Sequence, residues 1–158
     1  MTAGLRVGTG FDAHALEDGV PLVLGGIRIE SDRGLAGHSD GDVITHALID
    51  AVLGAAGLGD IGSLFPSDGS TPEGISSLDL LRDALGQVRA AGFEVVNADC
   101  VLVGEEPRIA PRRAELEGTL TELTGAPVSV RATTTDKLGF TGRGEGLAAE
   151  AVALLRQS

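Results

Sequence analysis

The sequence is organised around Gly37-His38-Ser39-Asp40-Gly41-Asp42-Val43-Ile44-Thr45-His46, which leads into a segment with apolar residues at helical spacing. This stretch contains two of the three histidines of the 158-residue chain. The third histidine lies in Gly10-Phe11-Asp12-Ala13-His14. Every imidazole of the protein therefore falls in one of two short segments that also contain aspartate.

These two segments form a candidate metal site. Residues i and i+2 of an extended segment point to the same side, so Asp12 and His14 can be directed at one point. Residues four apart share a helix face, which places Asp42 one turn before His46. Asp12, His14 and His46 would leave a fourth tetrahedral position open, as catalytic zinc sites do. The spacing alone leaves an alternative, in which the histidines are core or capping residues and the carboxylates are ordinary helix-terminal charges.

The composition fits one domain over residues 1–158. The chain has 12 Lys and Arg against 23 Asp and Glu, a net charge of −11, which disfavours nucleic acid or anionic membranes as partners. An anionic ligand would need metal ions and backbone amides to supply positive charge. The single cysteine, Cys100, lies in an apolar run, which indicates a reducing compartment and an inert core thiol. Met1 to Arg6 contains no apolar signal region, so we expect a cytoplasmic protein.

Hydrophobic periodicity and turn residues predict alternating strands and helices. The first strand, Leu5 to Gly10, would deliver Asp12 and His14 at its carboxyl end. Residues 63–74 have the composition of a mobile loop, and their length is typical of a lid. The other expected elements are a hairpin (21–24 and 27–29), a helix (41–56), a helix opened by a Ser76–Asp79 capping box and closed by Gly92, a strand (93–103), a helix (108–124) and a strand (128–133). Residues 147–155 fit either an alanine-rich helix or a strand buried on both faces.

A second group of polar residues lies late in the chain. Thr133-Thr134-Thr135-Asp136 places three hydroxyls, which can donate to phosphate oxygens, before a carboxylate that could hold Mg2+. The segment alone is also compatible with a threonine-rich strand followed by a hairpin. Gly8-Thr9-Gly10 does not complete a dinucleotide fingerprint, because Ala13 stands where the third glycine is required. No Walker Lys-Ser/Thr pair occurs in the sequence either.

Taken together, these motifs show that the chain resembles the 2-C-methyl-D-erythritol 2,4-cyclodiphosphate synthase family over nearly its whole length. The matching segments are Gly-Phe-Asp-x-His at 10–14, His-Ser-Asp-Gly-Asp-x-x-x-His at 38–46, Leu-Gly-Asp-Ile-Gly at 58–62, and residues 133–146. The resemblance implies a single α+β (α/β) domain with a mixed sheet of four to five strands and helices on one outer face. It also implies a homotrimer whose sheets face the central axis, and it makes residues 147–155 a strand.

The resemblance further implies the residues of the site. Zn2+ would bind Asp12, His14 and His46, and Mg2+ or Mn2+ would lie with the substrate diphosphate near Asp136. His38 and Thr134 would be the catalytic residues that position or stabilise the reacting phosphates. The implied substrate-binding residues are Asp12, Ala13, His14, His38, Ser39, Asp60, Ile61, Gly62, Phe65, Pro66, Ser67, Asp68, Gly69, Gly104, Glu105, Glu106, Pro107, Arg108, Ile109, Ala110, Thr133, Thr134, Thr135, Asp136, Phe140 and Arg143. Residues 104–110 with 133–135 would form a cytidine pocket against a neighbouring subunit's metal site.

The implied reaction is a step of non-mevalonate isoprenoid biosynthesis. The C2 phosphate of a cytidylated methylerythritol attacks the β-phosphorus, closes a cyclic diphosphate and expels CMP. Two residues depart from the family pattern: Asp136 stands where Glu is frequent, and Ser67 stands where Asp is usual. Two other functions stay open, namely a zinc-dependent phosphohydrolase and a noncatalytic trimer that binds a prenyl diphosphate or a metal.

Overall fold

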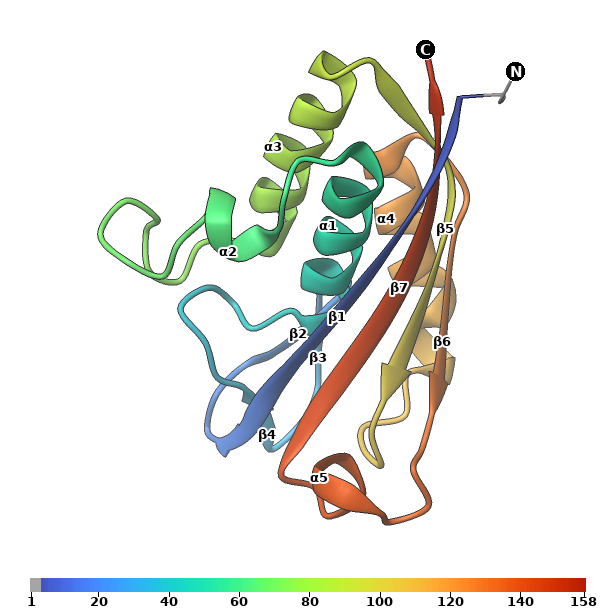
Figure 1. Cartoon of the computed structure of the whole chain (residues 1–158). Coiled ribbons are helices and arrows are strands. Elements are labelled where there is room, and N and C mark those ends of the chain that lie inside the picture. The colour runs from blue at the N-terminus through green and yellow to red at the C-terminus, as the bar shows by residue number, and fades with distance from the viewer. Residues whose placement is uncertain (1–3) are drawn as a thin grey trace.

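The computed structural model describes residues 4–158, which form a mixed five-stranded sheet covered by helices on one face (Figure 1). The strand order is β4-β1-β7-β5-β6, and all neighbours are antiparallel except the parallel pair β5 and β6. The strands of this sheet are β1 (Leu5–Asp18), β4 (Arg33–Leu35), β5 (Phe93–Val103), β6 (Val128–Thr133) and β7 (Gly146–Gln157). The predicted mixed sheet with helices on one face is confirmed.

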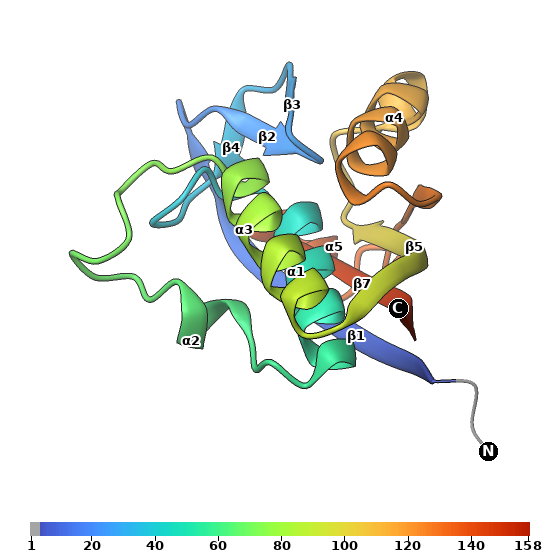
Figure 2. The ribbon, with the colours of Figure 1, turned by 90° about the horizontal axis from the view of Figure 1, so that it is seen from above.

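The remaining elements cover one face and the ends of this sheet (Figure 2). They are the hairpin β2 (Leu22–Leu24) and β3 (Ile27–Ile29), the helices α1 (Val43–Ala56), α2 (Ile61–Leu64), α3 (Ser77–Ala90), α4 (Arg113–Thr124) and α5 (Gly139–Gly142), and the 3-10 turn η1 (Ala110–Arg112). No helix within residues 4–158 is long and apolar enough to cross a membrane. The prediction about the amino-terminal segment also concerns Met1 to Ala3, which lie outside the described residues.

Helix α1 lies at the centre of the core, because it packs on β1 and β7 and is itself covered by α3 (Figure 2). Eleven of its 14 residues are buried, which explains its nearly continuous apolar sequence. The helix begins at Asp42, whose buried carboxylate accepts hydrogen bonds from the amide and hydroxyl of Thr45. The amides of Gly25 and Gly26 donate to the same carboxylate, so four donors take the place of the water that would otherwise solvate it. These hydrogen bonds also join the β2–β3 turn to α1.

Strand β1 and helix α1 approach each other closely at two glycines. A Cβ atom at Gly10 would lie 1.9 Å from the carbonyl oxygen of Ala47, and one at Gly8 would lie 2.0 Å from that of Ala51. Only glycine allows the helix to lie this close to the strand. The Gly8-Thr9-Gly10 segment therefore has a packing role, which fits its exclusion as a nucleotide fingerprint.

Strand β1 is longer than the predicted strand. Its antiparallel pairing with β7 continues to Ala15, and the strand itself ends at Asp18. Asp12 and His14 therefore lie within the strand and not after its carboxyl end. The alternation along β1 places them on the same face as Gly8 and Gly10, under α1, which confirms the expected i and i+2 geometry.

The predicted start of α3 at Ser76 is confirmed but its capping box is wrong, and the predicted start of α4 is wrong. Ser76 is the N-terminal cap of α3, but its side chain makes no capping hydrogen bond, so the predicted capping box with Asp79 does not form. Asp79 instead pairs with Arg82 on the exposed face of the helix, at 2.6 Å. The helix expected from Arg108 begins as α4 at Arg113, because η1, which contains proline, precedes it.

The later elements mostly match the predictions. The bounds of β5 and β6 agree, and Cys100 on β5 is buried, with burial raising its thiol pKa to about 12, as expected for an inert core residue. Residues 147–155 lie in β7, which confirms the strand. However, Glu150 and Val152 are exposed, so in this chain β7 is buried on one face only. The threonine-rich strand β6 is not followed by a hairpin, because α5 lies between it and β7 and β7 pairs with β5.

Candidate metal centre

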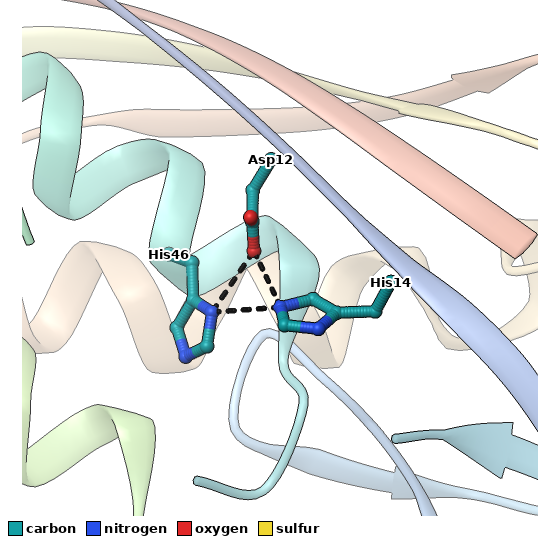
Figure 3. A group of neighbouring side chains, drawn as sticks. All are labelled: Asp12, His14 and His46. Carbon is teal, nitrogen blue, oxygen red and sulfur yellow. Dashed lines mark hydrogen bonds and ion pairs between the residues drawn. The ribbon is translucent and has the colours of Figure 1, made fainter. Parts of the chain in front are cut away.

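Asp12, His14 and His46 converge on one point between β1 and the first turn of α1 (Figure 3). The Asp12 Oδ2 atom lies 2.7 Å from His14 Nε2 and 2.9 Å from His46 Nδ1. The two imidazole nitrogens are 3.2 Å apart. The strand alternation and the helix start thus bring together the three side chains that the sequence predicted as a ligand set.

The charges within this cluster support each other. Burial alone would raise the pKa of Asp12, but hydrogen bonds from His14 and His46 and their positive charge outweigh burial and lower the pKa to about 2. The hydrogen bond that His14 donates to Asp12 also raises the pKa of His14, against the opposing effect of burial. The site therefore holds a carboxylate anion that attracts positive charge, whether protons on the imidazoles or a cation between them.

The donor set fits a divalent transition metal. Two imidazole nitrogens and one carboxylate oxygen are ligands that zinc takes in catalytic sites, and tetrahedral ligand atoms at zinc bond lengths lie about 3.3 Å apart. The distances in the cluster are shorter than this by at most about 0.6 Å, so the three side chains would need to separate only slightly to bind the ion. His14 Nδ1 donates to the carbonyl of Ala36 at 2.9 Å, so a metal ion can replace the proton that Nε2 shares with Asp12 in the metal-free chain.

A cavity of about 170 Å³ lies beside the cluster. Its lining residues are Asp12, His14, His38, Ser39, His46, Ile61, Gly62, Phe65, Ser67, Thr71 and Leu80. All but Thr71 and Leu80 had been predicted as site residues. Those two had no signal in the sequence, because one lies in an irregular loop and the other is an ordinary apolar residue of α3.

Five residues predicted near this cavity do not line it: Ala13, Asp60, Pro66, Asp68 and Gly69. Asp60 instead caps α2, where its carboxylate accepts from the amide of Ser63 at 2.8 Å. Asp68 turns back on its own loop and accepts from the amide of Ser70 at 2.8 Å. Local capping thus satisfies both carboxylates.

The loop between α2 and α3 is tied to His38. His38 Nε2 lies 2.6 Å from the carbonyl oxygen of Thr71, and the amide of Gly74 donates to the carbonyl of His38 at 2.7 Å. In neutral imidazole the proton on Nε2 is donated to Thr71, so Nδ1 offers only a lone pair. His38 could donate to a phosphate as an imidazolium through Nδ1, or after its contact with Thr71 is released.

The remaining predicted residues gather at a separate place. Residues 105–108 line a cavity of about 610 Å³ together with Arg33, and Arg143 lines a neighbouring cavity of about 370 Å³. The amide of Gly104 donates to the carbonyl of Thr133 at 3.1 Å, so segment 104–110 adjoins the end of β6. Within residues 4–158, neither segment 104–110 nor segment 133–136 lines the cavity at the Asp12 cluster.

Thr134 and Asp136 are exposed beyond the end of β6. The hydroxyl of Thr134 donates to Asp136 Oδ1 at 3.4 Å. Asp136 and Lys137 adopt positive φ values of 52° and 67°, which turn the chain toward α5. The hydroxyl and carboxylate predicted for phosphate and Mg2+ therefore lie together on a surface turn. Phe140 on α5 is also partly exposed.

The fold and the cluster define a class of small α+β proteins with a candidate metal centre between a strand and a helix. Residues 5–156 match the YgbB family, and the chain belongs to this family. It is 56% identical over 155 residues to a protein of Syntrophobacter fumaroxidans named 2-C-methyl-D-erythritol 2,4-cyclodiphosphate synthase, covering 96% of this chain and 98% of the relative.

Solved structures show the same likeness. A 2C-methyl-D-erythritol-2,4-cyclodiphosphate synthase in a CDP-bound form has a TM-score of 0.87 and 40% identity, over 95% of this chain and 99% of that one. The bifunctional IspDF of Campylobacter jejuni has a TM-score of 0.93 and 39% identity, covering 98% of this chain but 42% of the bifunctional one. These relatives confirm the family resemblance that the motifs indicated.

Proposed function

We propose that this protein is a metal-dependent cyclodiphosphate synthase, a phosphorus–oxygen lyase of non-mevalonate isoprenoid biosynthesis. It would convert 4-diphosphocytidyl-2-C-methyl-D-erythritol 2-phosphate to 2-C-methyl-D-erythritol 2,4-cyclodiphosphate and release CMP. The observation that carries the proposal is the convergence of Asp12, His14 and His46 beside a cavity, in a chain whose relatives carry this name.

The chain's own residues would mainly position charge. Zn2+ held by Asp12, His14 and His46 would supply Lewis acidity toward a phosphate oxygen. Mg2+ or Mn2+ near Asp136 would offset the diphosphate charge that a protein of net charge −11 cannot offset alone. His38, beside the cluster, would contact the reacting phosphates. Phosphoryl transfer needs such positioning more than a covalent nucleophile.

The proposed assembly is a homotrimer with active sites between subunits. The sheet face opposite the helices exposes the apolar side chains Leu5, Val7, Phe11 and Val152, which supports burial against other copies of the chain. The cytidine segments 104–110 and 133–135 do not line the chain's own metal cavity, which supports a site completed by a neighbouring subunit. Phe140 and Arg143 would lie close to the trimer axis. A single domain over 1–158 and a cytoplasmic location belong to the same proposal.

The two departures from the family pattern have different consequences. Ser67 lines the cavity, whereas the carboxylate of Asp68 is held by Ser70, so we propose that Ser67 and not Asp68 faces the sugar. The remaining residues of the loop, Phe65, Pro66 and Gly69, would shape the sugar pocket with Asp60 to Gly62. Asp136, with its shorter side chain, would reach Mg2+ with help from the turn at positive φ.

The reaction is tested by incubating the protein with the cytidylated phosphorylated methylerythritol and Mg2+. We expect release of CMP and a cyclic diphosphate that phosphorus NMR identifies. Release of inorganic phosphate would instead identify a zinc phosphohydrolase. Tight binding of a prenyl diphosphate without CMP release would point to a noncatalytic trimer.

Thr134→Ala is expected to lower kcat by roughly ten- to a thousandfold, because its hydroxyl would meet charge that develops in the transition state. The side chain is exposed, so the fold should not change. Steady-state kinetics of CMP release measures the effect, with Thr119→Ala as a control at a partly exposed threonine of α4. An unchanged kcat in Thr134→Ala would show that this hydroxyl has only a structural role.

A further inference from the structure

The two nitrogens of His46 face opposite directions. Nδ1 points to Asp12 and His14, and the other nitrogen points away from the cluster (Figure 3). There, Nε2 lies 2.8 Å from the hydroxyl oxygen of Ser77 and 2.9 Å from that of Ser39. A neutral imidazole binds a cation only through the nitrogen without a proton. His46 must therefore carry its proton on Nε2 when a metal ion replaces the proton that Nδ1 shares with Asp12.

Ser77 is oriented by a carboxylate. The side chain is fully buried at the start of α3, and its hydroxyl is hydrogen-bonded to Asp40 Oδ1. Its amide donates to Asp40 Oδ2 at 2.9 Å. Because an ionised carboxylate only accepts, the hydroxyl hydrogen of Ser77 must point to Asp40. The hydroxyl oxygen then presents a lone pair to Nε2 of His46, which must be the donor.

The hydroxyl of Ser39 does not by itself determine which nitrogen of His46 carries the proton. Among residues 4–158, the other hydrogen bond of its hydroxyl oxygen comes from the amide of Gly41, at a long 3.4 Å. Its hydroxyl hydrogen can therefore turn toward Nε2 and favour the tautomer with the proton on Nδ1. That tautomer would direct an N–H group at the metal position and oppose binding of a cation.

Asp40 also replaces a missing helix cap. The side chain of Ser76, the N-terminal cap residue of α3, makes no capping hydrogen bond. Asp40, which lies just before α1, accepts a hydrogen bond from the amide of Ser77 instead. The amide of Asp42 donates to Asp40 as well, at 3.1 Å. One carboxylate thus joins the first turn of α3 to the start of α1, where His46 lies.

We propose that Asp40 and Ser77 form a relay that holds the proton of His46 on Nε2 and so presents Nδ1 to the metal. Both are positioning residues, since they act through His46. In many metal sites a carboxylate or carbonyl accepts a hydrogen bond directly from a metal-binding histidine. Here the hydroxyl of Ser77 would lie between the histidine and the carboxylate. It rests on the metal-dependent function proposed above.

The test compares three proteins: the unchanged chain, Ser77→Ala and Ser76→Ala. Zinc affinity is measured after the metal is stripped with a chelator, and the exchange of the His46 Nε2–H proton is measured in the zinc-loaded form. Ser76→Ala is the matched control, because it removes a neighbouring exposed hydroxyl without a capping bond. Chelator competition should show zinc affinity about 10- to 100-fold weaker in Ser77→Ala and unchanged in Ser76→Ala. NMR of the zinc-loaded proteins should show an Nε2–H proton of His46 that is protected from exchange with water in the unchanged chain and that exchanges faster in Ser77→Ala.

Two results would overturn the relay: unchanged zinc affinity in a folded Ser77→Ala protein, or an Nε2–H proton of His46 that exchanges equally fast in the zinc-loaded unchanged chain and in zinc-loaded Ser77→Ala. If Ser77→Ala does not fold, the zinc-loaded unchanged chain decides alone, and an Nε2–H proton of His46 that exchanges freely with water would overturn the relay. Neither measurement uses CMP release. A failed cyclase assay would therefore leave this test intact, and a failed relay would leave the proposed reaction standing.

Discussion

His46→Ala is expected to abolish stoichiometric zinc binding and nearly all release of CMP. The substitution removes one of three converging donor atoms and leaves a cluster of one imidazole and one carboxylate. Two ligands hold zinc far more weakly than three, and Lewis acidity at the phosphate would be lost with the ion. Metal content after dialysis and the rate of CMP release measure the two losses.

The protein should stay folded after this substitution. His46 is buried, but its ring lies beside a cavity. Water can therefore reach the polar groups that lose their hydrogen bonds to His46. Circular dichroism and the size of the assembly check the fold, and we expect the proposed trimer to form in this variant as well. Retained turnover without bound zinc would refute the assignment of the metal site.

His38→Ala is the matched control for this prediction. His38 lines the same cavity and comes from the same motif, but it contacts Thr71 and is not part of the cluster. We expect this variant to keep its zinc and lose turnover, which separates metal binding from contact with the phosphates. Loss of zinc in both variants would mean that the motif acts on the metal only through its overall conformation.

Local geometry predicted only part of the ligand set, because it does not by itself bring the two segments of the chain together. Alternation along a strand places Asp12 and His14 on one face, and the spacing after Asp42 places His46 on the first turn of α1. The extension of β1 beyond Gly10 could not be derived in this way. It depends on pairing with β7, which lies more than a hundred residues later in the chain.

The supporting residues of the site are harder to predict. Ser77 reaches His46 only because α3 packs against α1, and no local pattern indicates that contact. Thr71 contributes a backbone carbonyl, which any residue could supply. Segment 104–110 was assigned to the site by resemblance alone, whereas segment 133–136 was also a candidate because of its hydroxyls and carboxylate. Within residues 4–158, neither segment lines the cavity at the Asp12 cluster.

Gly10→Ala is expected to weaken both folding and zinc binding. The new Cβ would lie 1.9 Å from the carbonyl oxygen of Ala47, a rigid backbone atom, so α1 must move away from β1. Overpacking of this kind costs about 1–3 kcal/mol and more when the obstacle is backbone, as it is here. Because Ala47 follows His46, the same movement would draw His46 away from Asp12.

Gly54→Ala is the matched control for this interface. A Cβ at Gly54 would lie 3.8 Å from the carbonyl oxygen of Thr9, an ordinary contact, and alanine favours a helix over glycine by about 1 kcal/mol. We therefore expect Gly54→Ala to be neutral or stabilising, with unchanged zinc affinity. Urea unfolding midpoints and chelator competition compare the two variants. A Gly10→Ala protein with the midpoint and zinc affinity of the unchanged chain would show that close approach of α1 to β1 does not hold the metal site together.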